Sequence, residues 1–181
     1  MNKVLKELLS TGLYLLGVLC VTYLLILYVI QLTNVDGESM EPTLHDGDRV
    51  FVDKITYQID DPERFDVIVF PVQYEEEKYF IKRIIGLPGE TVQIDTNGVI
   101  YINGEVLLES FGKEVIQADK IGLAAEPIVL GEDEYFVLGD NRNDSFDSRY
   151  AQVGNISRDD IIGRTWLLIW PLSDFGFVKH D

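Results

Sequence analysis

Two residues of the sequence have side chains suited to nucleophilic catalysis, Ser39 and Lys82. Ser39 lies in the run 37–44, a few residues after a long apolar segment, and Pro42 follows it closely. Proline cannot continue a helix and restricts the residue before it to extended geometry. The pattern predicts a constrained turn that fixes the Ser39 hydroxyl. The simpler alternative is a turn serine that bonds its own backbone.

Lys82 lies in the apolar stretch 79–85, which we expect to form a strand. Because alternate residues of a strand share a face, Phe80 and Ile84 flank Lys82 with apolar side chains. Burial would disfavour the ammonium form and lower the pKa to about 7–8, where an amine can act as a general base. A neutral Lys82 beside Ser39 would form a Ser-Lys dyad. An edge-strand lysine that opposes aggregation is the alternative.

A third stretch, residues 139–149, is dense in hydrogen-bonding side chains and follows a predicted strand at 135–138. Its acids and arginines alternate at short spacing. Such a stretch is often a solvated polar loop, but alternating charges also build a fixed ion-pair network that orients a site.

An apolar segment must position the Ser39 turn. No charged residue occurs between Leu8 and Val35, and the most apolar part, residues 13–32, has about the length of a membrane-crossing helix. We expect a cytoplasmic tail at 1–11, a transmembrane anchor at 12–33 and an extracytoplasmic domain at 34–181. A cleaved secretory signal or a buried core helix is the alternative.

Composition excludes several functions. The 181 residues carry a formal net charge of -16, which disfavours nucleic acid as a partner. The one cysteine, Cys20, excludes an intramolecular disulfide, and His45 and His180 are too peripheral to suggest a metal centre. All but one of the 31 acidic residues follow the apolar segment, whereas Lys3 and Lys6 precede it, as expected for a cytoplasmic N-terminus.

The remainder of the chain reads as short strands separated by turns. Asn97-Gly98 and Asn103-Gly104 are strong hairpin signals. Residues 109–126 lack periodicity and are expected to form a loop with a short helix. The pattern predicts a mainly β protein, an antiparallel sandwich or barrel. Its expected strands are 49–54, 66–70, 79–85, 91–94, 99–102, 106–107, 128–130, 135–138 and 161–170.

Three motifs in this order, residues 39–44, 82–90 and 139–149, resemble the signature boxes of type I signal peptidases, in the compact Gram-positive form. The resemblance implies a membrane-bound serine endopeptidase that removes signal peptides from exported preproteins after small residues, as in Ala-x-Ala, without cofactor or metal. It implies an all-β domain with a small β subdomain at about 90–130. Its partners are signal peptides and the lipid bilayer.

The resemblance also implies a role for each matched position. Ser39 corresponds to the nucleophile, with its backbone amide binding the oxyanion, and Lys82 to the general base. Ser145 corresponds to a serine that hydrogen-bonds the lysine. Val35 and Ile81 match positions that wall the pockets for small side chains. The residues expected to buttress the site are Asp147, Arg149, Arg83 and Arg142.

Two positions depart from the family pattern. Gly37 stands where Gram-negative members have a serine that helps to bind the oxyanion, so a second donor is missing. Asn143-Asp144 reverses the commoner order. The competing functions are a tethered β domain that binds without catalysis, a self-cleaving repressor, which would need a DNA-binding headpiece, and a His-dependent hydrolase, for which His45 lies too close to Ser39.

Overall fold

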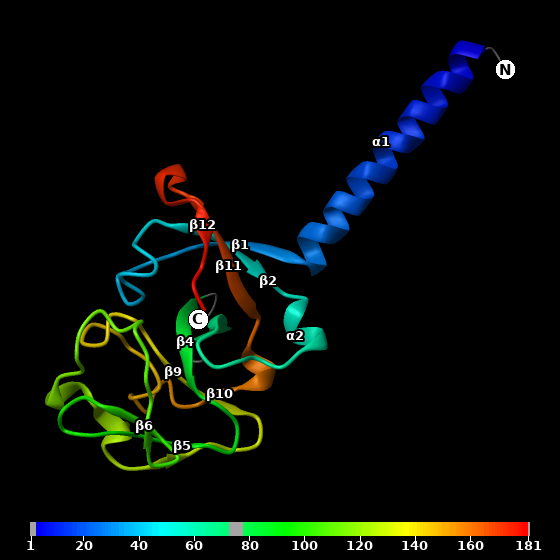
Figure 1. The fold of residues 1–181 in the computed structure, drawn as a ribbon. Helices are drawn as coiled ribbons and strands as arrows, with labels where there is room; N and C mark the ends of the chain where they lie inside the picture. Colours follow the sequence, from blue (N-terminus) through cyan, green and yellow to red (C-terminus); the bar gives the residue numbers. More distant parts are fainter. Residues whose placement is uncertain (1–2, 73–77, 181) are drawn as a thin grey trace.

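The computed structural model describes residues 3–72 and 78–180, and it consists of one long helix and a mainly β domain (Figure 1). The helices are α1 (Lys3–Tyr28) and the short α2 (Thr56–Ile59). Four 3-10 turns follow, at Ala118–Lys120, Gly122–Ala125, Arg158–Asp160 and Leu172–Asp174. The strands are β1 (Ile30–Asn34), β2 (Arg49–Asp53), β3 (Val67–Pro71), β4 (Tyr79–Gly86), β5 (Thr91–Ile94), β6 (Ile100–Ile102), β7 (Glu105–Val106), β8 (Ile128–Val129), β9 (Glu134–Leu138), β10 (Ile156–Ser157), β11 (Gly163–Trp170) and β12 (Gly176–Phe177).

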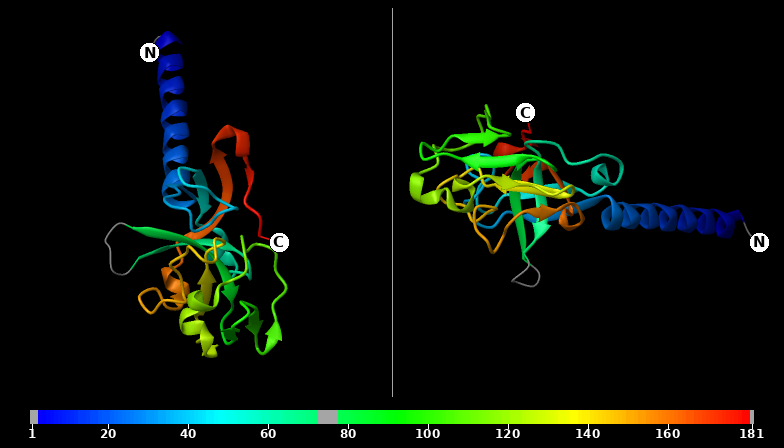
Figure 2. Two further views of the ribbon diagram at one scale, coloured as in Figure 1. Left: turned by 90° about the vertical axis from the view of Figure 1, so that its left-hand side faces the viewer. Right: turned by 90° about the horizontal axis from the view of Figure 1, so that it is seen from below.

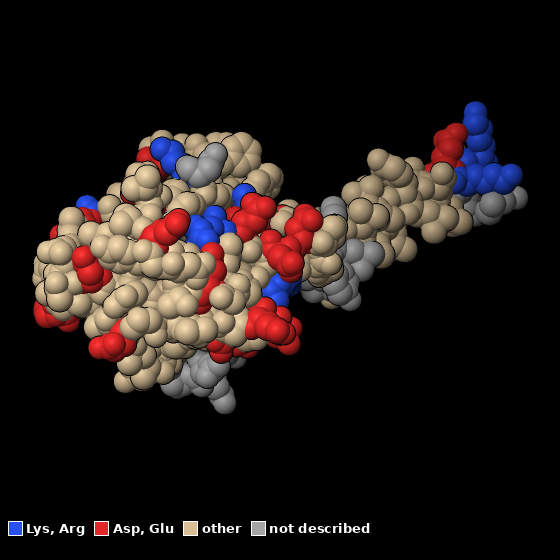
Figure 3. All heavy atoms as spheres, turned by 60° about the horizontal axis from the view of Figure 1, so that its bottom comes forward, with Lys and Arg blue, Asp and Glu red and all other residues tan. Residues whose placement is uncertain are grey.

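Helix α1 projects away from the β domain in every view (Figures 1 and 2). Its charged residues are confined to the N-terminal end, where Figure 3 shows basic and acidic atoms beyond an uncharged stretch. We expected a transmembrane anchor over residues 12–33. Across the part of the chain that the structure describes, no helix combines the length and the apolar character that crossing a membrane requires.

The helix is shorter than the apolar segment. It ends at Tyr28, and residues 30–33, which we had assigned to the anchor, belong with Asn34 to β1. Strand β1 pairs antiparallel with β2, with Leu32 opposite Phe51 and Asn34 opposite Arg49. Ladder hydrogen bonds to β2 therefore override the helical continuation that the apolar run suggested. As a result, the chain enters the Ser39 turn directly from a paired strand.

The larger sheet holds the centre of the domain. Its strand order is β1-β2-β11-β3-β4-β9-β10, with β12 paired to β11, and every recorded pairing is antiparallel. Strands β3 and β4 are buried along most of their length, as their continuous apolar runs require. Within the described residues, β1 and β10 are the ends of this order, so the sheet is open and not a closed barrel.

The smaller sheet has the order β7-β6-β5-β8 and covers the region about 90–130 where we expected a small β subdomain. Its first hairpin turns at Asp95–Gly98, where Gly98 has a φ of 78°. The Asp95 carboxylate accepts hydrogen bonds from the Asn97 and Val99 amides. Isoleucine and valine side chains of this sheet pack with Phe136 and Leu138 of β9. The Lys113 amide donates to the Asp140 carbonyl at 2.8 Å, so the segment 107–127 lies against the polar stretch that follows β9.

Candidate active site

The Ser39 turn is fastened to the larger sheet from both sides. The Val35 amide donates to the Asp48 carbonyl at 2.8 Å, and the Gly37 amide donates to the Asp46 carboxylate at 2.8 Å. Gly37 has a φ of 91°, a conformation that favours glycine. Met40 is buried in the core beneath the turn. The half-buried Ser39 side chain is therefore held at the surface by a turn with a buried base.

Lys82 lies on β4 and is 3% exposed, so burial of this lysine is observed as the alternating pattern suggested. Its Nζ donates to Ser39 Oγ at 2.6 Å and to the carbonyl of Ile81 at 3.0 Å. The amine also lies 4.9 Å from the centre of the Phe80 ring. The structure thus brings the nucleophile candidate and the base candidate into direct contact.

Burial lowers the pKa of Lys82 to about 8, against an ordinary value of 10.5. The negative charges of Asp147 and Asp140 oppose this shift, and the positive charge of Arg149 adds to it. About a tenth of the amine is therefore uncharged at pH 7, and about half at pH 8. An uncharged amine at this distance can accept the serine proton.

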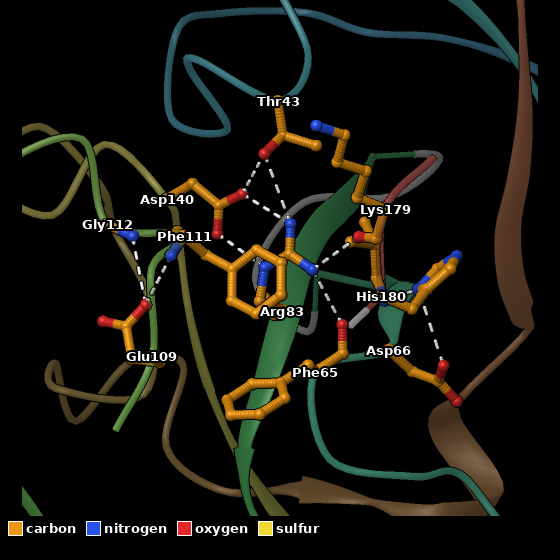
Figure 4. Close-up of polar contacts among 12 residues, drawn as sticks. Thr43, Phe65, Asp66, Arg83, Glu109, Phe111, Gly112, Asp140, Lys179 and His180 are labelled. Atoms are coloured by element: carbon orange, nitrogen blue, oxygen red, sulfur yellow. Dashed lines mark hydrogen bonds and ion pairs between the residues drawn. The ribbon is translucent and has the colours of Figure 1, made fainter. Parts of the chain in front are cut away.

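Arg83, the residue after Lys82, points to the other face of β4 and forms a buried ion pair with Asp140. Its Nε and Nη2 donate to the two Asp140 oxygens at 2.8 and 2.7 Å, and both side chains are 0% exposed. Thr43 Oγ1 donates to the same carboxylate at 2.5 Å. This pair joins the loop after β9 to β4 and to the turn that carries Ser39, as Figure 4 shows.

The remaining donors of Arg83 reach the backbone. Nη1 donates to the carbonyls of Phe65 and Lys179, each at 2.8 Å, and the guanidinium stacks 3.8 Å from the centre of the Phe111 ring. Lys179, two residues before the last residue of the sequence, is thus tied to the strand that carries Lys82 (Figure 4). A buried arginine is tolerated here because its N–H donors and the flat face of its guanidinium group are all engaged.

Asp147 and Arg149 form a second buried pair beneath the loop. Arg149 donates to the two Asp147 oxygens at 2.7 and 2.8 Å, and Asp147 also accepts the Gly139 amide at 3.0 Å. Arg149 extends further to the Lys120 carbonyl at 2.9 Å. The pair therefore fixes the loop after β9 against the 3-10 turn at 118–120.

Arg142 joins the same loop to the segment that contains Glu109. It donates to Glu109 at 2.6 Å and to the Gly139 carbonyl at 3.1 Å. Burial opposes ionisation of Glu109, but the charge and hydrogen bond of Arg142, together with the Phe111 and Gly112 amides that donate to the carboxylate, hold its pKa below the ordinary value. The four expected buttressing residues thus form three ion pairs, with acids at 109, 140 and 147.

Ser145 differs from the expectation. It is buried, and its Oγ has no hydrogen-bond partner among the described residues. We expected a bond to the Lys82 amine, but that amine donates instead to Ser39 and to the Ile81 carbonyl. Ser145 Oγ does lie close to the site, because a Cβ added at Gly139 would come within 2.2 Å of it and 2.4 Å of the Ser39 carbonyl.

A cleft of about 500 Å³ opens in front of Ser39 and Lys82. Val35 and Ile81, the expected pocket residues, both line it and are 5% and 7% exposed. Asn143, Asp144 and Ser145 line the cleft as well. Ser39 therefore lies in an open cleft that both apolar and polar residues line.

Several residues at the site escaped the sequence reasoning. Asp140 and Asn141 lay inside a recognised motif, but their partners are far away in the chain. Thr43 followed Ser39 without a signal of its own, and Glu109 lay in the stretch without periodicity. In the described part of the chain, no group of three or more histidine, cysteine, aspartate or glutamate residues could hold a metal ion.

A mainly antiparallel β domain that presents a serine hydroxyl at a cleft is an arrangement compatible with a serine peptidase. Residues 8–170 match the family model described as signal peptidase, peptidase S26, and the chain therefore belongs to the signal peptidase I family. The resemblance inferred from the motifs is confirmed. The family assignment makes the chain a serine endopeptidase that removes signal peptides.

Relatives match over most of the chain. A probable signal peptidase I-2 from Synechocystis is 38% identical over 159 residues, 85% of this chain and 69% of its own length. Signal peptidase I T from Bacillus subtilis is 38% identical over 151 residues, 80% of this chain and 76% of its own. The crystal structure of a signal peptidase I from Enterococcus faecalis covers 59% of this chain and 97% of its own, at 35% identity and a TM-score of 0.47.

Proposed function

We propose that this signal peptidase cleaves preproteins by a Ser39-Lys82 dyad through an acyl-enzyme, and that it cuts after small residues at Ala-x-Ala-like sites. The observation that carries the proposal is the 2.6 Å contact between Lys82 Nζ and Ser39 Oγ, made by an amine that is 3% exposed. A lysine can serve as a base only when it is uncharged, and burial supplies that condition.

The acylation half of the reaction needs two proton transfers, and hydrolysis of the acyl-enzyme needs two more. Neutral Lys82 accepts the Ser39 proton as Oγ attacks the scissile carbonyl, and the carbonyl π electrons move to its oxygen. The tetrahedral intermediate collapses, the C–N bond breaks, and the lysine ammonium gives its proton to the leaving amine. Water, deprotonated by the same amine, then hydrolyses the ester and restores Ser39. The Ile81 carbonyl accepts from the amine and helps to orient its lone pair toward the serine.

The Ser39 backbone amide is the proposed oxyanion donor. A serine hydroxyl in place of Gly37 would offer a second donor, and one such donor is worth about 3 kcal/mol in related sites. Val35 and Ile81 are proposed to wall the pockets for the P1 and P3 side chains, both on the N-terminal side of the cleavage point, and to limit these side chains to small ones. Their burial in the cleft wall supports this role.

Five further residues are proposed to support the dyad without touching substrate. The Arg83 ion pair fastens β4 to the loop after β9. The Arg142 pair joins that loop to Glu109, and the Arg149 pair with Asp147 fixes it against the 3-10 turn at 118–120. Ser145 Oγ is proposed to hydrogen-bond the Lys82 amine and to hold it toward Ser39. Its buried, unpartnered Oγ supports that role in the described structure.

The test of the dyad is cleavage of a preprotein by purified Ser39→Ala and Lys82→Met variants, with Ser157→Ala and Lys54→Met as matched controls outside the cleft. Both dyad variants are expected to lose at least a thousandfold in kcat/KM, and both controls to keep the parent rate. Undiminished cleavage by either dyad variant would exclude the mechanism. A preprotein panel varied at the P1 and P3 positions tests the preference for small residues.

The lipid bilayer is the second proposed partner, with the N-terminus in the cytoplasm and the catalytic domain outside. Helix α1 supports it, since its apolar side chains are exposed and its lysines lie at the far end. Trp170 and Phe177 at the end of the larger sheet are 52% and 70% exposed, and tryptophan favours the membrane interface. Alkaline extraction of membranes tests attachment. Protection of the domain from protease in sealed vesicles tests the orientation.

A further inference from the structure

Asn141 contacts the backbone on both sides of the nucleophile. Its own amide donates to the Ser39 carbonyl at 3.0 Å, and its side-chain Nδ2 donates to the Glu38 carbonyl at 3.1 Å. The side chain is buried, with the residue 4% exposed. One residue of the loop after β9 thereby fixes two successive peptide groups of the turn, although it lies 103 positions from Glu38.

The Glu38 carbonyl belongs to the peptide group whose N–H is the Ser39 amide. Because a trans peptide is planar, its N–H points opposite to its C=O. The Glu38 carbonyl accepts from Asn141 and from the Glu41 amide at 3.1 Å, so the orientation of this peptide is fixed by two donors. Among the described residues, the Ser39 amide itself donates to none. It is a donor left without a protein partner, in a residue that lines the cleft.

We infer that the Asn141 side chain positions the oxyanion donor, by holding the Glu38–Ser39 peptide with its N–H turned to the cleft. A hydrogen bond to the carbonyl also polarises the peptide and strengthens its N–H as a donor. Asn141 acts through the peptide and touches neither substrate nor the Lys82 amine, so it is a positioning residue. The inference rests on the proposed function, because it assigns the Ser39 amide to the oxyanion.

The chemistry of the side chain explains why an amide is needed. Asparagine supplies an N–H donor at this point, whereas an aspartate of the same shape would turn a charged oxygen toward the Glu38 carbonyl. Stabilisation of the oxyanion depends strongly on this contact, because Gly37 contributes no hydroxyl and the turn offers the oxyanion only backbone donors. A site with fewer donors relies more on the orientation of each.

The experiment compares Asn141→Ala and Asn141→Asp with the parent enzyme and with Asn155→Ala. Asn155 is the matched control, because its side-chain amide donates to Glu134 at 2.9 Å, away from the cleft. The measurements are kcat and KM on a peptide substrate, and the Ki of a peptide aldehyde with the same sequence. The aldehyde forms a tetrahedral adduct with Ser39 whose oxygen occupies the oxyanion position.

Both Asn141 variants are expected to lose about tenfold to hundredfold in kcat, with KM within about twofold of the parent. The Ki of the aldehyde should rise by the same factor as kcat falls. The pH at which kcat/KM is half-maximal should stay unchanged, because Lys82 is not contacted. Asn155→Ala should match the parent in every measurement.

Three results would overturn the inference. An increase in KM with unchanged kcat would assign Asn141 to substrate binding, and a shifted pH profile would assign it to the dyad. If active-site titration showed fewer active molecules in the Asn141 variants, each with the parent activity, Asn141 would have only a role in folding. The Ser39→Ala variant separates failure of the dyad from failure of this inference. If the proposed dyad were wrong, Ser39→Ala would still cleave substrate, whatever the result for Asn141.

Discussion

The amine of Lys82 and the hydroxyl of Ser39 lie 2.6 Å apart, although one belongs to a buried strand and the other to a surface turn 43 positions earlier. The pKa of Lys82 is lowered to about 8, chiefly by burial. Since only the uncharged amine accepts a proton, kcat/KM should rise with pH up to about 8 and level off above it. Steady-state cleavage between about pH 6 and pH 10 checks this. A flat profile below pH 8 would contradict it.

The same burial predicts an effect on stability. A lysine whose pKa is lower in the folded protein is protonated more readily in the unfolded chain, so its burial penalty is full below about pH 8 and vanishes above about pH 10.5. Lys82→Met should therefore be more stable than the parent by up to about 3 kcal/mol at pH 7. The gain should shrink as pH rises from 8 to 10.5. Urea unfolding at a series of pH values measures it, and a constant difference would contradict the assignment.

Gly139 is predicted to tolerate no side chain. A Cβ there would lie 2.2 Å from Ser145 Oγ and 2.4 Å from the Ser39 carbonyl, so Gly139→Ala must push the nucleophile turn away from the loop after β9. A displacement near 1 Å costs about a hundredfold in rate. The rate of peptide cleavage and the temperature of thermal unfolding should both fall. Gly176→Ala is the control, because its nearest neighbour would be 3.9 Å away, and parent-like cleavage by Gly139→Ala would contradict the close packing.

Asp140→Asn should destabilise the fold by about 3–5 kcal/mol, because it leaves the buried Arg83 guanidinium without its charged partner. The ion pair between Lys113 and Glu41 has the same 2.7 Å distance but is exposed, and Glu41→Gln is expected to change little. Chemical denaturation of both variants makes the comparison. Equal effects would show that burial does not govern the strength of these pairs.

Removal of residues 178–181 should destabilise the protein by about 1–3 kcal/mol or more, because Arg83 loses the Lys179 carbonyl as an acceptor. Val178, which is buried, is lost as well. Lys179→Ala keeps the carbonyl and should unfold like the parent. A shortened chain as stable as the parent would show that this end of the protein does not support β4.

The strands of the centre were predictable because their apolar, β-branched runs are bounded by strong turn signals. Strand β1 was not, since Ile30–Asn34 continues an apolar run and apolar character alone does not separate helix from strand. The two-residue strands β10 and β12 escaped because they exist only through their partners in the sheet. No local pattern encodes such pairings.

The residues of the candidate site also divide into those that the sequence predicted and those that only the fold reveals. Ser39 and Lys82 stood out by residue type and neighbourhood, but their contact depends on how β4 pairs and where the turn folds. Glu109 and Asn141 act through partners 33 and 103 positions away, which no spacing within a motif reveals. The missing bond between Ser145 and Lys82 likewise depends on side-chain orientation. Family motifs therefore indicated the candidate site, whereas the contacts that support it follow from the fold.

Helix α1 passes into β1 with a single intervening residue, and a linker of only ten residues separates Tyr28 from Ser39. Even fully stretched, that linker would reach at most about 40 Å, and pairing with β2 removes its slack. For a helix held in a bilayer as proposed, the scissile bond must come to a nearly constant height above the lipid. The enzyme would then cut only at a fixed distance from the membrane surface, and exported proteins whose cleavage point lies farther out would not reach the active site.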